Sequence, residues 1–128
     1  MRRLAPTVLV ALALLAACGG TDDGAADAGG PTALEIALWP AGEGQGTAVV
    51  ATLTCDPAGG DLPDPAAACA ALAAEADALE PVGPDIACTE IYGGPEEARI
   101  TGTLDGVEVA VRLSRVDGCE IDRWERLR

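Results

Sequence analysis

The chain has 128 residues, enough for one small domain, and it contains no Lys, His, Asn or Phe. Without His it lacks the usual general base for a Ser or Cys nucleophile, and without His or a close Cys pair it lacks ordinary zinc ligands. We therefore expect neither an enzyme nor a cofactor. The net charge of −13 argues against nucleic acid and anionic membrane surfaces as partners, because both repel an acidic protein.

The first residues have the pattern of an export signal. Arg2 and Arg3 precede an apolar run over residues 4–15 that is too short for a permanent membrane span. The run ends in Leu15-Ala16-Ala17-Cys18, which resembles the bacterial lipobox, where signal peptidase cuts before a lipid-modified cysteine. This pattern predicts a signal peptide over residues 1–17 and a lipid on Cys18. The alternative is a plain secretory signal, which would leave Cys18 as the odd thiol among five.

Residues 18–31 are predicted to form a flexible acidic tether, since Gly, Ala, Asp and Thr dominate and nothing there can build a core. The folded domain is then expected over residues 32–128, a size at which disulfides usually assist the core. We expect an exported protein, lipid-anchored to the outer face of the cell membrane or released outside the cell. The lipid would be its only contact with the membrane.

Two strands and a helix are predicted in the first part of the domain. Leu34, Ile36 and Leu38 alternate with smaller or polar residues, and Thr47–Cys55 gives a second alternating segment. Asp64 is suited to cap a helix that begins at Pro65. The apolar positions of this helix follow at helical spacing until Pro81 ends it, and they are Cys69, Leu72, Ala76 and Leu79.

A hairpin is predicted later in the chain. Ile100, Gly102 and Leu104 alternate up to Asp105-Gly106, a dipeptide suited to a tight two-residue turn, and residues 107–113 alternate back. Residues 124–128 are expected to be a short, partly exposed tail. Strands and one main helix in this order predict an α+β sandwich, in which a largely antiparallel sheet is covered by helix on one face.

Four cysteines remain for the domain and allow three pairings. Cys55 ends a strand and Cys69 lies near the start of the helix across a Gly-rich turn, so a bond between them would staple helix to sheet. Cys88 would then pair with Cys119. A metal site made from the same four residues is the weaker alternative, given their wide spacing and the oxidising compartment that export implies.

The segment from Cys88 to Pro95 has the features of a stiff exposed loop. Thr89 and Ile91 are β-branched and favour extended backbone, and Glu90 between them is costly to bury. A pre-ordered extended loop of this kind suits the cleft of a protease. An ordinary surface connection between strands is the alternative.

Five segments taken together resemble the subtilisin-inhibitor family of high-GC Gram-positive bacteria. The match runs in order from about Leu34 to Trp124 and keeps the four-cysteine spacing; its segments are Thr54–Gly60, Pro63–Leu72, Cys88–Tyr92, Thr101–Gly106 and Gly118–Ile121. The resemblance implies a sheet of about five strands with two helices and the disulfides Cys55–Cys69 and Cys88–Cys119. It also implies tight inhibition of subtilisin-like serine proteases and a homodimer formed through the sheet.

Carried over by position, the resemblance makes Glu90 the specificity residue and Glu90–Ile91 the scissile bond. Cys88 and Thr89 then precede the bond, and Ile91 and Tyr92 lie on its leaving side. The family commonly has a bulky apolar or basic residue at the position of Glu90, so a protease that prefers acidic residues is the expected target here.

A non-inhibitory surface lipoprotein is the competing interpretation. It would use the same scaffold as a binding module for another envelope protein or a small ligand, with Trp39, Tyr92 and Trp124 available for a contact surface.

Overall fold

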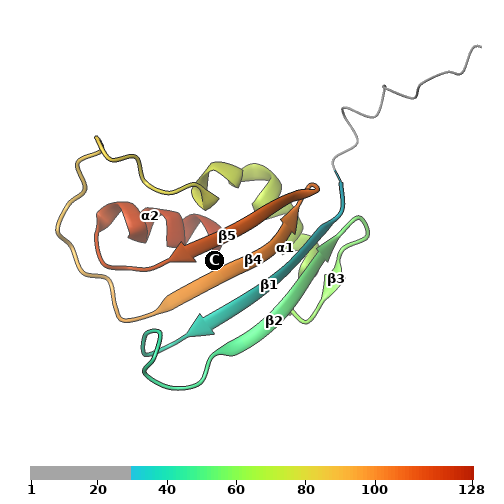
Figure 1. Cartoon of the computed structure of the whole chain (residues 1–128), viewed down its shortest axis with the longest axis horizontal. Coiled ribbons are helices and arrows are strands. Elements are labelled where there is room, and N and C mark those ends of the chain that lie inside the picture. Colours follow the sequence, from blue (N-terminus) through green and yellow to red (C-terminus); the bar gives the residue numbers. More distant parts are fainter. Residues whose placement is uncertain (1–29) are drawn as a thin grey trace, which may run out of the picture.

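The structure is a computed structural model that describes residues 30–128. The predicted signal peptide, Cys18 and nearly all of the predicted tether lie outside the described residues. The described chain forms one sheet with helices packed against it (Figure 1). Within these residues no helix is both long and apolar enough to cross a membrane.

The sheet is antiparallel throughout and has the strand order β3-β2-β1-β4-β5. Strand β1 is central, and its residue Ile36 lies between Ala51 of β2 and Ile100 of β4. The strands are β1 (Thr32–Trp39), β2 (Val49–Cys55), β3 (Gly59–Gly60), β4 (Glu97–Leu104) and β5 (Val107–Leu113). The α+β fold predicted from the sequence is confirmed.

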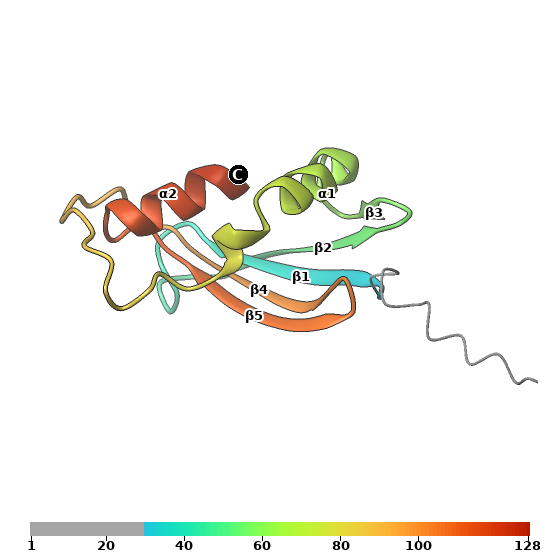
Figure 2. The ribbon, with the colours of Figure 1, turned by 90° about the horizontal axis from the view of Figure 1, so that it is seen from above.

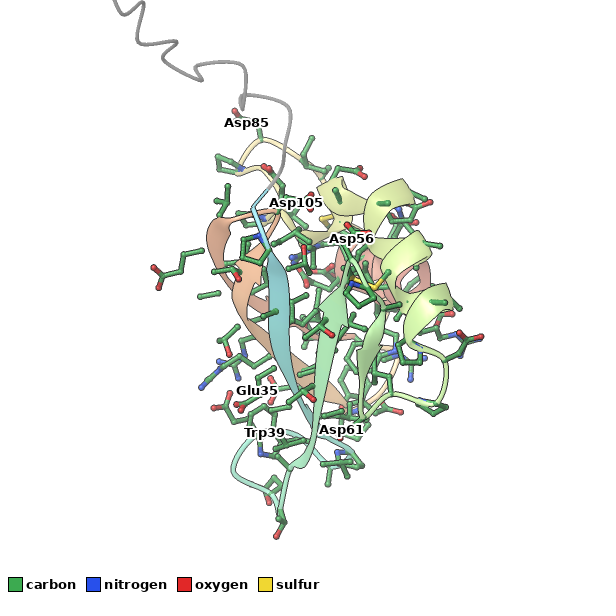
Figure 3. All side chains as sticks on the ribbon, turned by 90° about the vertical axis from the view of Figure 1, so that its right-hand side faces the viewer. Glu35, Trp39, Asp56, Asp61, Asp85 and Asp105 are labelled. Carbon is green, nitrogen blue, oxygen red and sulfur yellow. A yellow bond between two sulfur atoms is a disulfide. The ribbon has the colours of Figure 1, made fainter. Side chains whose placement is uncertain are left out.

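Alternation along the strands decides which side chains form the core. Leu34, Leu53 and Ile100 lie on one face and are buried beneath the helices. Glu35 and Trp39, labelled in Figure 3, lie on the opposite face of β1. There the guanidinium of Arg99 lies 5.7 Å from the centre of the Trp39 ring, a cation–π distance.

Helix α1 (Pro65–Ala74) begins as predicted, because the side chain of Asp64 accepts a hydrogen bond from the backbone N–H of Ala67 at 3.0 Å. It does not continue to Leu79 as one helix. The backbone leaves the α-helical conformation at Glu75, and a 3₁₀ helix, η2 (Ala76–Leu79), follows. This break turns Ala78 and Leu79 into the core.

The expected tail at residues 124–128 is wrong. Residues 124–127 belong to the second helix, α2 (Gly118–Leu127), and Trp124 and Leu127 pack against the core. The side chain of Asp117 caps this helix by accepting a hydrogen bond from the N–H of Glu120 at 2.9 Å. The second helix that the family resemblance implied is therefore present.

Both helices cover the same face of the sheet, and the other face is open (Figure 2). Between α1 and α2 lies an apolar groove of about 420 Å³, lined by Leu53, Trp124 and the α1 residues Ala67, Ala68 and Ala71 among others. Alanine side chains are too short to fill this space. The core on the α1 side is consequently thin.

Two disulfides cross-link this fold, and both predicted pairs are confirmed. Cys55–Cys69 joins β2 to α1 with a Cα–Cα distance of 5.9 Å. Cys88–Cys119 joins the connection before β4 to α2 with a Cα–Cα distance of 5.4 Å.

Candidate functional site

The connection between η2 and β4 contains the candidate loop. It has no regular secondary structure, and it projects beyond one end of the sheet (Figure 1). Glu90 is exposed, and the residues that follow it, Ile91 and Tyr92, are 60% and 65% exposed. Large apolar side chains so open to solvent are available to a partner.

On the N-terminal side of Glu90 the loop is fixed to the start of α2. Cys88 is bonded to Cys119, and the N–H of Gly118 donates to the carbonyl of Thr89 at 2.9 Å. A Cβ at residue 118 would overlap Oγ1 of Thr89, so any larger residue there would displace the Thr89 hydroxyl.

On the C-terminal side the loop is fixed to the segment just before α2. The N–H of Gly93 donates to the carbonyl of Arg115 at 2.7 Å. Gly93 also lies against Ile121 of α2, where an added Cβ would come within 2.9 Å of the Ile121 side chain. The sequence gives no sign of this second anchor, because contacts across more than twenty residues leave no local pattern.

Helix α2 is itself held at the base of the loop by Arg123. Its buried guanidinium donates to the carbonyls of Ala78 and Leu79 in η2, with Nε–O and Nη2–O distances of 2.9 and 3.4 Å. It also binds both carboxylate oxygens of Glu120. Arg123 thus ties α2 to the element from which the loop departs, and sequence reasoning did not single it out.

A second arginine of α2 binds acidic residues at and before η2. Arg126 of α2 binds Glu75 and Asp77, with N–O distances of 2.5 and 2.6 Å. The hydrogen bond from Arg126 lowers the pKa of the Asp77 carboxyl below its usual value. Within the described chain Glu90 makes no ion pair, so its charge is free to meet a partner.

One group of residues beside the loop has the residue types of a metal site. Cys88, Cys119 and Asp117 lie close together, but both sulfurs are used in the disulfide and cannot act as thiolate ligands. What remains is a recognition element: a short exposed peptide whose two stems are fixed to a single helix and the residues that precede it. Proteins with such an element offer the peptide to the cleft of a partner.

Comparison with known proteins agrees with a protein that offers an exposed loop to a partner. The sequence model of the subtilisin inhibitor-like family matches residues 30–114, and the chain belongs to this family. Members of the family are inhibitors and not enzymes. Comparison with curated protein sequences found no significant match.

One of the solved structures to which the chain is similar is sermetstatin from Streptomyces caespitosus, in complex with subtilisin from Bacillus licheniformis. The two chains are 28% identical, with a TM-score of 0.51, and the match covers 77% of this chain and 97% of the sermetstatin chain.

Proposed function

We propose that this domain inhibits serine proteases by presenting the segment from Cys88 to Tyr92 as a reactive loop, with Glu90–Ile91 as the scissile bond. The carrying observation is that this exposed segment lies between two backbone anchors, at Thr89 and Gly93. Membership of the subtilisin inhibitor-like family and the likeness to sermetstatin, which was solved with a subtilisin, support the proposal.

Inhibition follows from what happens to the bond after attack. The protease serine adds to the Glu90 carbonyl, and the amine of Ile91 is the leaving group. Because the backbone on both sides of the bond is anchored to residues 115–121, the amine stays beside the acyl-enzyme and returns to it. Hydrolysis is slow because religation is faster than release.

Specificity is assigned to Glu90. Placing its ionised carboxylate in an apolar specificity pocket removes hydration worth several kcal/mol unless a cation compensates it. The expected target is a serine protease with a pocket for acidic residues, and a subtilisin should be bound less well.

A titration tests both statements. The purified protein and its Glu90→Leu variant are titrated against a Glu-preferring serine protease and a subtilisin, with residual activity as the readout. Glu90→Leu should strengthen inhibition of subtilisin by about a hundredfold and weaken inhibition of the Glu-preferring enzyme. The matched control is Glu108→Leu, which removes the same charge from an exposed position on β5.

If parent and variants all leave both proteases active while they remain folded and disulfide-bonded, the inhibitor proposal is wrong. The non-inhibitory surface lipoprotein would then take its place.

The anchoring proposal concerns Cys18. We propose that the mature chain begins at this lipid-modified cysteine, followed by a tether over residues 18–31 and the domain over residues 32–128. Strand β1 begins at Thr32, at the end of the sheet opposite the reactive loop (Figure 1), which supports a domain whose loop faces away from its anchor. Cys18→Ala should release the protein from the membrane fraction or leave the precursor uncut, and an unmodified Cys18 in intact-mass analysis would contradict the proposal.

The open face of the sheet is the surface for a proposed homodimer (Figure 2). It carries small side chains such as Ala33 and Ala37 beside Glu35, which would let two sheets approach closely. Sedimentation equilibrium over a range of concentrations tests this, and a monomer at every concentration would refute it.

A further inference from the structure

Cleavage of Glu90–Ile91 would leave two new ends that are held by different contacts. Cys88 precedes the bond, so the Cys88–Cys119 disulfide retains the acyl end. The new amine on Ile91 belongs to the segment that continues into β4, and the disulfide leaves that segment's first residues free. Retention of the amine must therefore come from contacts made after Ile91.

Those contacts converge on Arg115. Its carbonyl accepts the 2.7 Å hydrogen bond from the N–H of Gly93. Its guanidinium Nη1 lies 3.0 Å from Oε1 of Glu96, the residue just before β4. One residue thus holds the amine segment at two points, through its backbone at Gly93 and through its side chain at Glu96.

The side chains of this pair pack directly against the loop stem. Arg115 and Glu96 are only 24% and 33% exposed. Between them passes Gly94, with φ of +145°, and a Cβ there would lie 3.0 Å from Nη1 of Arg115 and even closer to the Glu96 carboxylate. The ion pair therefore lies in direct contact with the stem at Gly94.

We propose that Arg115 is a positioning residue which, through its ion pair with Glu96, holds the amine of Ile91 within reach of the acyl-enzyme and so sets the rate of religation. The proposal rests on the proposed inhibitory function. Its physical basis is effective concentration: an amine held near the acyl carbon attacks as an intramolecular nucleophile, whereas a freely moving one is replaced by water.

The chain offers a matched control pair. Arg112 of β5 and Glu97 of β4 form an ion pair of 2.9 Å between the same residue types, each within three residues of its counterpart. This second pair bridges two strands and makes no hydrogen bond to residues 88–94. Disrupting it removes the same charges without touching the loop stem.

The experiment follows religation directly. The variants Arg115→Met and Glu96→Gln are compared with the controls Arg112→Met and Glu97→Gln. Each is incubated with a catalytic amount of protease, starting either from the intact chain or from chain already cleaved at Glu90–Ile91. Mass spectrometry gives the rate at which intact chain reappears and the final ratio of intact to cleaved chain, and thermal melting of every variant reports stability. We expect Arg115→Met and Glu96→Gln to slow religation about tenfold and to turn inhibition into a temporary effect, with parent rates for the controls.

Each outcome decides the question. If Arg115→Met and Glu96→Gln religate as fast as the controls, the proposal is overturned while the inhibitory function stands. If the parent inhibits no serine protease, both fall together. Should Arg115→Met fail to fold, Glu96→Gln decides alone, because it keeps the shape of the side chain and removes only the charge.

Discussion

The two helices lie side by side on one face of the sheet and are held there by different means. Helix α1 has no charged residue between Pro65 and Ala74, and Leu72 is its one buried residue. Helix α2 is rich in charge, and its buried residue is Arg123, which binds backbone carbonyls of η2. Each helix is joined by one disulfide to a different partner: α1 to the sheet and α2 to the loop.

The comparison indicates a division of tasks. An alanine helix buries little apolar area, so α1 depends on Cys55–Cys69 to stay on the sheet. Helix α2 has polar contacts of its own to η2, and its disulfide restrains the loop. The same kind of bond is thus expected to stabilise the fold at one end of the molecule and to maintain function at the other.

The largest effect is expected from the double substitution Cys88→Ser with Cys119→Ser. Loss of this cross-link should lower the free energy of unfolding by about 4 kcal/mol on chain-entropy grounds, and the freed acyl end should make the loop an ordinary substrate. Incubation with the target protease, followed by mass spectrometry, should show rapid cleavage at Glu90–Ile91. If the variant resists cleavage as well as the parent does, the Cys88–Cys119 disulfide has no role in inhibition.

Loss of the other bond should act on stability alone. Cys55→Ser with Cys69→Ser is expected to lower the free energy of unfolding by about 3 kcal/mol, because the loop it closes is shorter. Inhibition by the molecules that remain folded should match the parent. Urea unfolding measures the free energy of unfolding, and titration of the protease measures the inhibition constant. An altered inhibition constant would show that Cys55–Cys69 also contributes to function.

The ion pairs of α2 should give it a pH dependence that α1 lacks. Arg126 lowers the pKa of Asp77, so the pair contributes stability above the ordinary Asp pKa of about 4, and this contribution is lost as pH falls through the lowered value. Parent and Asp77→Asn should therefore differ in urea midpoint at pH 6 and converge under acid conditions. The parent and the Asp77→Asn variant differ by only one unit of net charge, so their comparison largely cancels effects of total charge. A difference in urea midpoint that persists at the lowest pH would contradict the role given to the Asp77–Arg126 pair.

The smallest effect is expected from filling the groove beside α1. Ala71→Leu places an apolar side chain in the space between α1 and α2, and we expect the free energy of unfolding to rise by about 1 kcal/mol. Thermal melting measures the change. A lower melting temperature would show that the groove is too narrow for leucine and that α1 is better packed than its composition suggests.

Much of the molecule was determined by the sequence itself. Alternation gave the two halves of the sheet, Asp64-Pro65 gave the start of α1, and Asp105-Gly106 gave the hairpin, because each depends on neighbours only a few residues away. Cys55 at the end of β2 and Cys69 across a turn indicated one bond, and the family resemblance implied both bonds. The candidate loop was located by its residue types and by the family resemblance.

The tertiary structure alone decided how that loop is held. No sequence pattern marks Arg115, Ile121 or Arg123 as a residue that holds the loop. In the fold, the Arg115 carbonyl and the Ile121 side chain contact Gly93, and the Arg123 guanidinium binds a backbone carbonyl of η2. Each of these contacts joins residues more than twenty positions apart in the sequence. Such contacts depend on where α2 crosses the sheet, and no local propensity encodes that crossing.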